Sequence, residues 1–145
     1  MHFSARIYRM ISHTICGYMN EQQKTVTRSK TQAWARANNL RPDRCELCGI
    51  SVQDIQEEHA RCGEILQLAP RRLFIVAHHW KGYEYPFDVW WICFSCNKQL
   101  HHRHDGSLTK EEARQLVSKR SRLRDGNIEV WDMDTCMWVA KYPRR

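Results

Sequence analysis

Two cysteine motifs, Cys45-Glu46-Leu47-Cys48 and Cys93-Phe94-Ser95-Cys96, decide how this chain folds. Each motif presents two thiols from one tight turn, and Gly49 supplies a permissive backbone after the first turn. Four thiolates in two such pairs are a common ligand set for a closed, structural Zn²⁺ site. A redox centre is the alternative, but two pairs in one chain favour a metal. The sequence therefore predicts a structural zinc site formed by Cys45, Cys48, Cys93 and Cys96.

The chain has seven cysteines, so three of them lie outside this set: Cys16, Cys62 and Cys136. An odd number argues against a framework of disulfides. We expect Cys136 to pack inside a hairpin, and Cys62 to become a ligand only if one of the four motif cysteines fails. Thiols spaced as metal ligands indicate a reducing compartment, so the expected location is intracellular.

The composition is that of a globular chain. Its 145 residues are 27% charged and 42% hydrophobic, which suits one domain with or without extensions. No apolar run approaches the roughly 20 residues of a membrane helix. The sequence therefore excludes an integral membrane protein.

The net charge of +7 is unevenly distributed. Residues 1–44 hold eight basic and two acidic side chains, and residues 98–124 hold eight basic and three acidic ones. Residues 45–97 are acidic overall, with four basic and seven acidic side chains. Two basic flanks of this kind favour a polyanionic partner, nucleic acid first. Plain solubility is the alternative explanation.

Periodicity and turn signals predict a mixed α+β chain. Residues 21–30 are expected to be a polar linker or a frayed start. Helices are expected at 31–40, 52–59, 94–104 and 110–123, the last starting from the capping box Thr109-x-x-Glu112. Strands are expected at 72–77 and 89–92, and a hairpin at 127–140.

The first twenty residues contain Arg6 and Arg9 but no acidic side chain. Three interpretations fit this composition: an organelle transit peptide, an upstream start codon with Met19 as the true start, and an ordinary helix or strand.

Histidines gather around the second cysteine motif. His78-His79 closes an expected strand, and Asn97 and His101 stand four residues apart on an expected helix. Because positions i and i+4 share a helix face, Asn97 and His101 could hold one ion together with His78. His79 would then be free to act on water. The alternative is that these side chains are ordinary polar residues of the surface or core.

The run from His78-His79 through Tyr83, Pro86 and Asp88-Val89-x-Trp91-Ile92 to Cys93-x-x-Cys96-Asn97-Lys98-x-x-His101 resembles the zinc-containing HNH endonucleases. Small phage-type members of that family share this signature. The stretch from Ala33-Trp34 to Leu40-Arg41-Pro42-Asp43-Arg44-Cys45 resembles their N-terminal helix and first cysteine pair. The resemblance covers residues 31–104.

This resemblance implies an α+β fold built on a small, zinc-stabilised ββα-metal domain. An N-terminal helix and a C-terminal helix plus β-hairpin would extend it. The expected divisions are an N-terminal extension at 1–30, the HNH-like zinc domain at 31–106, and a C-terminal extension at 107–145.

The resemblance also implies roles for the site residues. His79 is the expected general base, since a neutral imidazole near pH 7 suits proton abstraction from water. His78, Asn97 and His101 are the expected ligands of a second, catalytic divalent ion, which would be Mg²⁺, Mn²⁺, Ni²⁺ or Zn²⁺. Asp88 stands where many members have an asparagine that orients the loop bearing the base. Asn97 stands where the phage-type proteins have histidine, and His102 and His104 are substitute ligands if the helix register differs.

The expected function is metal-dependent hydrolysis of DNA phosphodiester bonds by an HNH-type endonuclease. One alternative is a catalytically inactive zinc module that binds nucleic acid or a protein partner, and another is a ribonucleoprotein subunit. The expected partner is nucleic acid, DNA ahead of RNA, with no membrane involved. The expected setting is a bacterial or phage-infected cytoplasm, with an organelle as the alternative. The side chains expected to hold phosphates are Arg28, Lys30, Arg36, Lys98, Arg103, Arg114, Lys119, Arg120 and Arg122.

Overall fold

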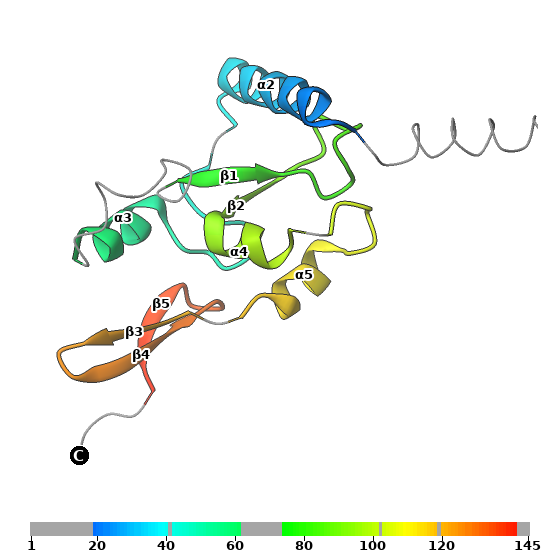
Figure 1. Cartoon of the computed structure of the whole chain (residues 1–145). Coiled ribbons are helices and arrows are strands. Elements are labelled where there is room, and N and C mark those ends of the chain that lie inside the picture. Colours follow the sequence, from blue (N-terminus) through cyan, green and yellow to red (C-terminus); the bar gives the residue numbers. More distant parts are fainter. Residues whose placement is uncertain (1–18, 41, 62–73, 102, 119, 142–145) are drawn as a thin grey trace, which may run out of the picture.

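The computed structural model describes residues 19–40, 42–61, 74–101, 103–118 and 120–141. Its elements mix helices and strands, as the sequence predicts. In chain order they are α2 (Glu21–Asn38), α3 (Val52–Arg61), β1 (Ile75–His78), β2 (Trp90–Cys93), α4 (Phe94–Gln99), α5 (Lys110–Leu116), β3 (Ser121–Arg124), β4 (Asn127–Asp132) and β5 (Met137–Ala140) (Figure 1). The expectations for residues 1–18, Cys62, His102, Lys119 and the start of the strand at 72–77 fall outside the described residues.

The helix α2 begins ten residues earlier than predicted, so a linker at 21–30 is wrong. Asn20 and Gln23 form a capping box at its start. One face of the helix is buried through Thr27, Thr31 and Ala35, which are spaced four apart. These side chains are small and partly polar, so the packing that stabilises the helix leaves little apolar periodicity in the sequence. The expected boundary at residue 30 therefore falls inside α2.

The strands β1 and β2 form an antiparallel hairpin that leads directly into α4. Its register pairs Ile75 with Cys93 and His78 with Trp90. In Figure 1, α2 lies on one side of this hairpin and α4 on the other. The helix α4 ends at Gln99 and not at residue 104, so His101 lies in the turn that follows.

The C-terminal region contains one helix and a three-stranded sheet. The capping box of Thr109 and Glu112 starts α5 as predicted, but the helix ends at Leu116 instead of 123. The predicted hairpin is present as β4 and β5, and β3 adds a third strand that was expected to be helical. A two-residue turn of Asp125 (φ 50°) and Gly126 (φ 77°) joins β3 to β4, and these left-handed angles suit a tight hairpin.

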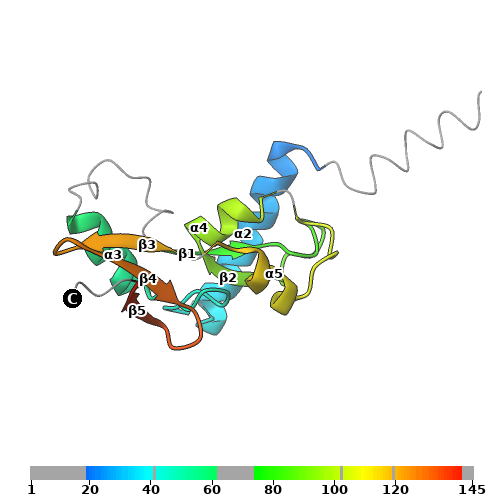
Figure 2. The same cartoon turned by 90° about the horizontal axis from the view of Figure 1, so that it is seen from below.

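One buried cluster joins the cysteine motifs to the C-terminal region. Ile92 and Cys93 are fully buried, and Leu47, Ile75 and Trp131 are each 1% exposed. Trp131 belongs to β4, so the sheet packs into the same core as the cysteines. Figure 1 shows the sheet lying below α3, and in Figure 2, which is seen from below, the sheet overlaps α3. No helix in the described part of the chain has the length and apolar character to cross a membrane.

Candidate metal centre and histidine pocket

The four motif cysteines converge on one point. The cysteines Cys45 and Cys48 flank a tight turn, Cys93 ends β2, and Cys96 lies in the first turn of α4. All four side chains are buried, and their sulfur atoms lie within 4.8 Å of one another. The predicted ligand set is therefore assembled by the fold.

Both motifs aim the backbone N–H of their second cysteine at the sulfur of their first. The backbone N–H of Cys48 donates to Cys45 Sγ at 3.4 Å, and that of Cys96 donates to Cys93 Sγ at 3.4 Å. Amides aimed at sulfur stabilise negative charge on it. Gly49 follows the first motif with φ of 78°, as the turn requires.

The spacing of the sulfurs suits a tetrahedral metal ion such as zinc. An ion about 2.3 Å from four sulfurs at tetrahedral corners holds each pair of sulfurs roughly 3.8 Å apart. The Cys48 and Cys93 sulfurs are 3.8 Å apart, which is far longer than the ~2.05 Å of a disulfide. The hydrogen bond between Cys45 and Cys48 lowers the pKa of Cys45 and raises that of Cys48. Neighbouring sulfurs thus share protons, and a bound cation would replace these protons.

The C-terminal sheet reaches the metal centre through Arg120 and Trp131. The guanidinium of Arg120 donates to Cys93 Sγ at 2.8 Å, and the indole N–H of Trp131 donates to the Cys48 carbonyl at 2.6 Å. Burial alone would lower the pKa of Arg120, but the charge on the four sulfurs, Cys93 foremost, outweighs it and raises the pKa. The thiolates are therefore the counter-charge of this half-buried arginine.

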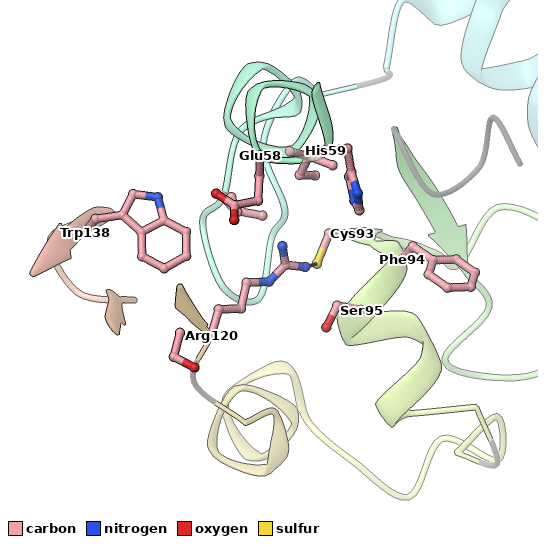
Figure 3. A pocket seen from close by; sticks show the side chains of 10 residues that line it. Glu58, His59, Cys93, Phe94, Ser95, Arg120 and Trp138 are labelled. Atoms are coloured by element: carbon pink, nitrogen blue, oxygen red, sulfur yellow. Dashed lines mark hydrogen bonds between the residues drawn. The ribbon is translucent and has the colours of Figure 1, made fainter. Parts of the chain in front are cut away.

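A cavity of about 370 Å³ lies between α3, the sheet and the metal centre (Figure 3). Figure 3 shows Arg120 extending along it to Cys93, with Glu58 and His59 on the α3 side. The charged groups are already paired, because Arg120 contacts Cys93 and Glu58 lies 3.5 Å from Arg122.

A second pocket, of about 730 Å³, gathers the histidines. It is formed by α2, β1, α4 and the loops after β1 and α4. Its lining includes His78, His79, Asn97, His101, His104, Thr31, Tyr83, Arg28 and Lys98. The predicted base and the predicted ligands therefore border one space.

His78 is almost completely buried at the end of β1. Its Nδ1 atom lies 3.0 Å from Asn97 Oδ1, and its Nε2 atom is buried without a hydrogen bond to any described residue. Burial lowers the pKa of His78 to about 4, although Asn97 and the backbone of Arg103 oppose that shift. The ring is therefore neutral near pH 7, the form in which histidine binds metals.

His79 is held by α2. Its Nε2 atom lies 2.9 Å from the hydroxyl of Thr31, which also lies 2.6 Å from the Pro86 carbonyl. Burial, helped by charge at His104, lowers the pKa of His79 to about 4. Thr31 is a site residue that the sequence argument missed, because residues 21–31 gave no apolar signal for a helix.

His101 and His104 border the pocket, but their arrangement differs from the predicted one. His101 is exposed in the turn after α4, so it does not share a helix face with Asn97. The Nδ1–H of His104 donates a hydrogen bond to the His79 carbonyl at 3.2 Å. The ring centroids of His104 and His78 are 4.7 Å apart. In the described part of the chain, only the four cysteines bring three or more ligand groups of the His, Cys, Asp and Glu types to ion-binding distances.

The other predicted site residues divide into three groups. Asp88 lies outside the pocket lining, and its carboxylate is 4.0 Å from Lys81 in the loop that follows the histidines. Arg28 and Lys98 border the pocket, whereas Lys30, Arg36 and Arg103 are exposed elsewhere on the surface.

Three predicted phosphate-binding residues have partners within the protein instead. Arg114 donates to the Leu47 carbonyl at 3.1 Å, and Arg120 donates to Cys93. Arg122 is 10% exposed and pairs with Glu129 at 2.6 Å. The prediction is corrected for these three, since they stabilise the C-terminal region and the metal centre.

Comparisons with known proteins find no relative of this chain. No family model, no curated protein and no solved structure matches this chain. The class that the fold and the site define is a small α+β protein with four cysteines in metal-binding geometry.

Proposed function

We propose that this protein is a metal-dependent nuclease of HNH type that hydrolyses DNA phosphodiester bonds at the histidine pocket. The observation that carries the proposal is the meeting of His78, His79 and Asn97 in one pocket beside Arg28 and Lys98. A neutral imidazole can act as a general base, a second one can bind a divalent ion, and two cations can hold phosphates. The cysteine centre, which we propose to hold Zn²⁺, has the structural role.

The residues divide the work as follows. His79 would accept a proton from water, and Thr31 would keep its ring oriented through the 2.9 Å contact at Nε2. His78 would bind a divalent ion through its Nε2 atom, because its Nδ1–H donates to Asn97 Oδ1 and Asn97 thereby fixes the tautomer instead of binding the ion. His101 or His104 would move in as a further ligand. Such an ion stabilises negative charge on the phosphate. Arg28 would contact a phosphate, since it lies within reach of the pocket and of the Tyr83 hydroxyl at 3.3 Å.

Plasmid cleavage tests this proposal. The zinc-loaded, full-length protein would be incubated with supercoiled DNA and Mg²⁺, Mn²⁺, Ni²⁺ or added Zn²⁺. His79→Ala should reduce the cleavage rate by about 10²–10⁴-fold, the usual loss for a general base. His59→Ala is the matched control, because His59 borders the other cavity, and it should cleave like the parent. Absence of cleavage with all four ions by a folded, zinc-loaded protein would refute the enzyme.

A zinc-stabilised binding module is the second candidate. Two observations favour it. Within the described residues, the histidine side chains do not come together at ion-binding distances, and Asp88 lies outside the pocket. The module would bind DNA with a salt-dependent affinity but would not cut it. Fluorescence anisotropy with labelled DNA distinguishes the two candidates: binding that persists in His79→Ala, without cleavage by the parent protein, supports the module.

A further inference from the structure

The cavity between α3 and the C-terminal sheet leads to one sulfur of the metal centre. Of the four motif cysteines, Cys93 borders this cavity, whereas Cys45, Cys48 and Cys96 do not. The cavity is partly open to solvent and has a volume of about 370 Å³, which is room for several water molecules. A small molecule that enters it therefore meets Cys93 before the other three sulfurs.

Arg120 covers this sulfur. Cys93 is fully buried although it borders the cavity, and the Arg120 guanidinium donates to its Sγ atom at 2.8 Å. In Figure 3 the Arg120 side chain extends through the cavity and ends at that sulfur. The backbone of this arginine is also fixed, because the N–H of Trp131 donates to the Arg120 carbonyl at 2.8 Å. Arg120 is thus held as a lid on Cys93.

The charge of this lid suits the centre. A divalent ion with four thiolates is left with roughly two negative charges, and a guanidinium is always positive in proteins. Cys93 Sγ accepts from two donors, Arg120 and the backbone N–H of Cys96. None of the hydrogen bonds among the described residues joins another motif sulfur to a charged side chain. Because a charged donor stabilises a thiolate, Arg120 both shields and stabilises the one sulfur that the cavity reaches.

We propose that Arg120 controls metal exchange by blocking attack through this cavity at Cys93. A metal acceptor with a nitrogen or sulfur donor atom enters when the guanidinium moves aside. That donor atom replaces Cys93 Sγ on the ion, and the freed thiolate takes a proton from water, so no electron is transferred. This role rests on the zinc occupancy proposed above, and it is independent of nuclease activity.

Zinc transfer to a chromogenic pyridylazo chelator tests the proposal. The full-length, zinc-loaded protein is mixed with excess chelator, and absorbance gives the transfer rate. Arg120→Gln removes the charge and is too short to reach the sulfur. The rate should therefore rise by about 10–100-fold, the usual loss of metal affinity when such a partner is removed, and it should increase with chelator concentration. Arg120→Lys keeps the charge in the sheet but also stops short of the sulfur, so it should release zinc faster than the parent even if Arg120→Gln does not fold.

Arg122→Gln is the matched control. Arg122 is another half-buried arginine of the same sheet, but its partners are Glu129 and Glu58 and not a motif sulfur. Its loss leaves the Arg120 contact in place, so zinc transfer should stay close to the parent rate.

Alkylation separates an open lid from a general loss of stability. The zinc-loaded proteins are treated with N-ethylmaleimide, and mass spectrometry identifies which motif cysteine reacts first. In Arg120→Gln, Cys93 should react ahead of the other three, whereas a destabilised protein would expose all four together. The parent and Arg122→Gln should show no preference for Cys93.

The zinc content of the parent separates failure of the lid from failure of the metal centre. A folded parent protein that binds no zinc would refute both. If the parent binds zinc, two results would overturn the lid alone: a transfer rate that neither Arg120 variant changes, and an Arg120→Gln variant in which Cys93 does not react first.

Discussion

Acid should destabilise this protein through its buried histidines, and His79 provides the sharpest test. Burial lowers the pKa of His79 in the folded protein to about 4, against an ordinary value of 6.5. A proton therefore binds the unfolded chain more readily than the folded one. Above pH 6.5 this group does not affect stability, and between pH 6.5 and 4 stability is lost as the pH falls.

The size of the loss follows from the two pKa values. Between pH 7 and pH 5, a histidine with a pKa of 6.5 when unfolded and about 4 when folded reduces the free energy of unfolding by about 2 kcal/mol. His78 has the same lowered pKa and contributes a similar amount. Because a small domain has only ~5–15 kcal/mol in total, such a loss is large.

Urea unfolding at pH 7, 6 and 5 measures this effect through the fluorescence of the six tryptophans. The comparison is between the parent protein and His79→Gln, whose amide can still reach the Thr31 hydroxyl but cannot titrate. Between pH 7 and pH 5 the variant should lose about 2 kcal/mol less than the parent. Zinc content is measured at each pH, since the thiolates also respond to acid and do so in both proteins.

The free energy of unfolding changes with pH in both proteins. The difference between their two pH dependences gives the contribution of His79, because the thiolates contribute equally to both. Equal slopes for the parent and His79→Gln, with zinc retained in both, would refute the argument that burial depresses this pKa.

Three further predictions concern the metal centre. Removing the metal with a chelator, or replacing Cys48 with serine, should abolish cooperative thermal unfolding, because a structural site of this kind contributes most of the stability of a small domain. Circular dichroism measures the unfolding, and zinc analysis measures the loss of metal. Gly49→Ala should cost about 2–4 kcal/mol, because φ is 78° and the new Cβ would clash with Cys136 Sγ. Adding Cys136→Ala should recover the part due to the clash but not the part due to φ, as a double-mutant cycle in urea would show. Trp131→Phe should cost about 1–3 kcal/mol in urea unfolding, because it leaves the buried Cys48 carbonyl without its indole donor.

The metal centre could be predicted from the sequence because its signal is local. Two cysteines in one turn, followed by glycine in the first motif, specify a ligand pair whatever the rest of the fold does. The helix at Val52 and the hairpin at β4–β5 were also predicted correctly, since each carries its own periodicity or turn signal.

The start of α2 and the strand β3 were missed for different reasons. The buried face of α2 uses Thr27 and Thr31 instead of large apolar residues, although the capping pair Asn20-x-x-Gln23 could have indicated the helix start. Residues 121–124 carry a single apolar side chain, and pairing with β4 makes them a strand. The Asp125-Gly126 pair could have predicted that hairpin turn.

The histidine pocket was predicted only in part, because its composition depends on tertiary contacts. The sequence placed His78 and His79 at the end of a strand, but the contact of Thr31 with His79 joins residues that are far apart in the chain. The inward orientation of Arg120 and Arg122 could not be predicted either, since their partners are Cys93 and Glu58.

The separation of the two cysteine motifs sets an order of events during synthesis. A nascent chain that ends before Cys93 holds only the first pair of thiols, so an ion at this centre would have half of its ligands until the second pair leaves the ribosome. The contacts of Arg120 and Trp131 are made to Cys93 and Cys48, so the sheet has its docking surface only after the centre has closed. If the centre holds an ion as we propose, the supply of that ion during translation would set when the last part of this protein can fold.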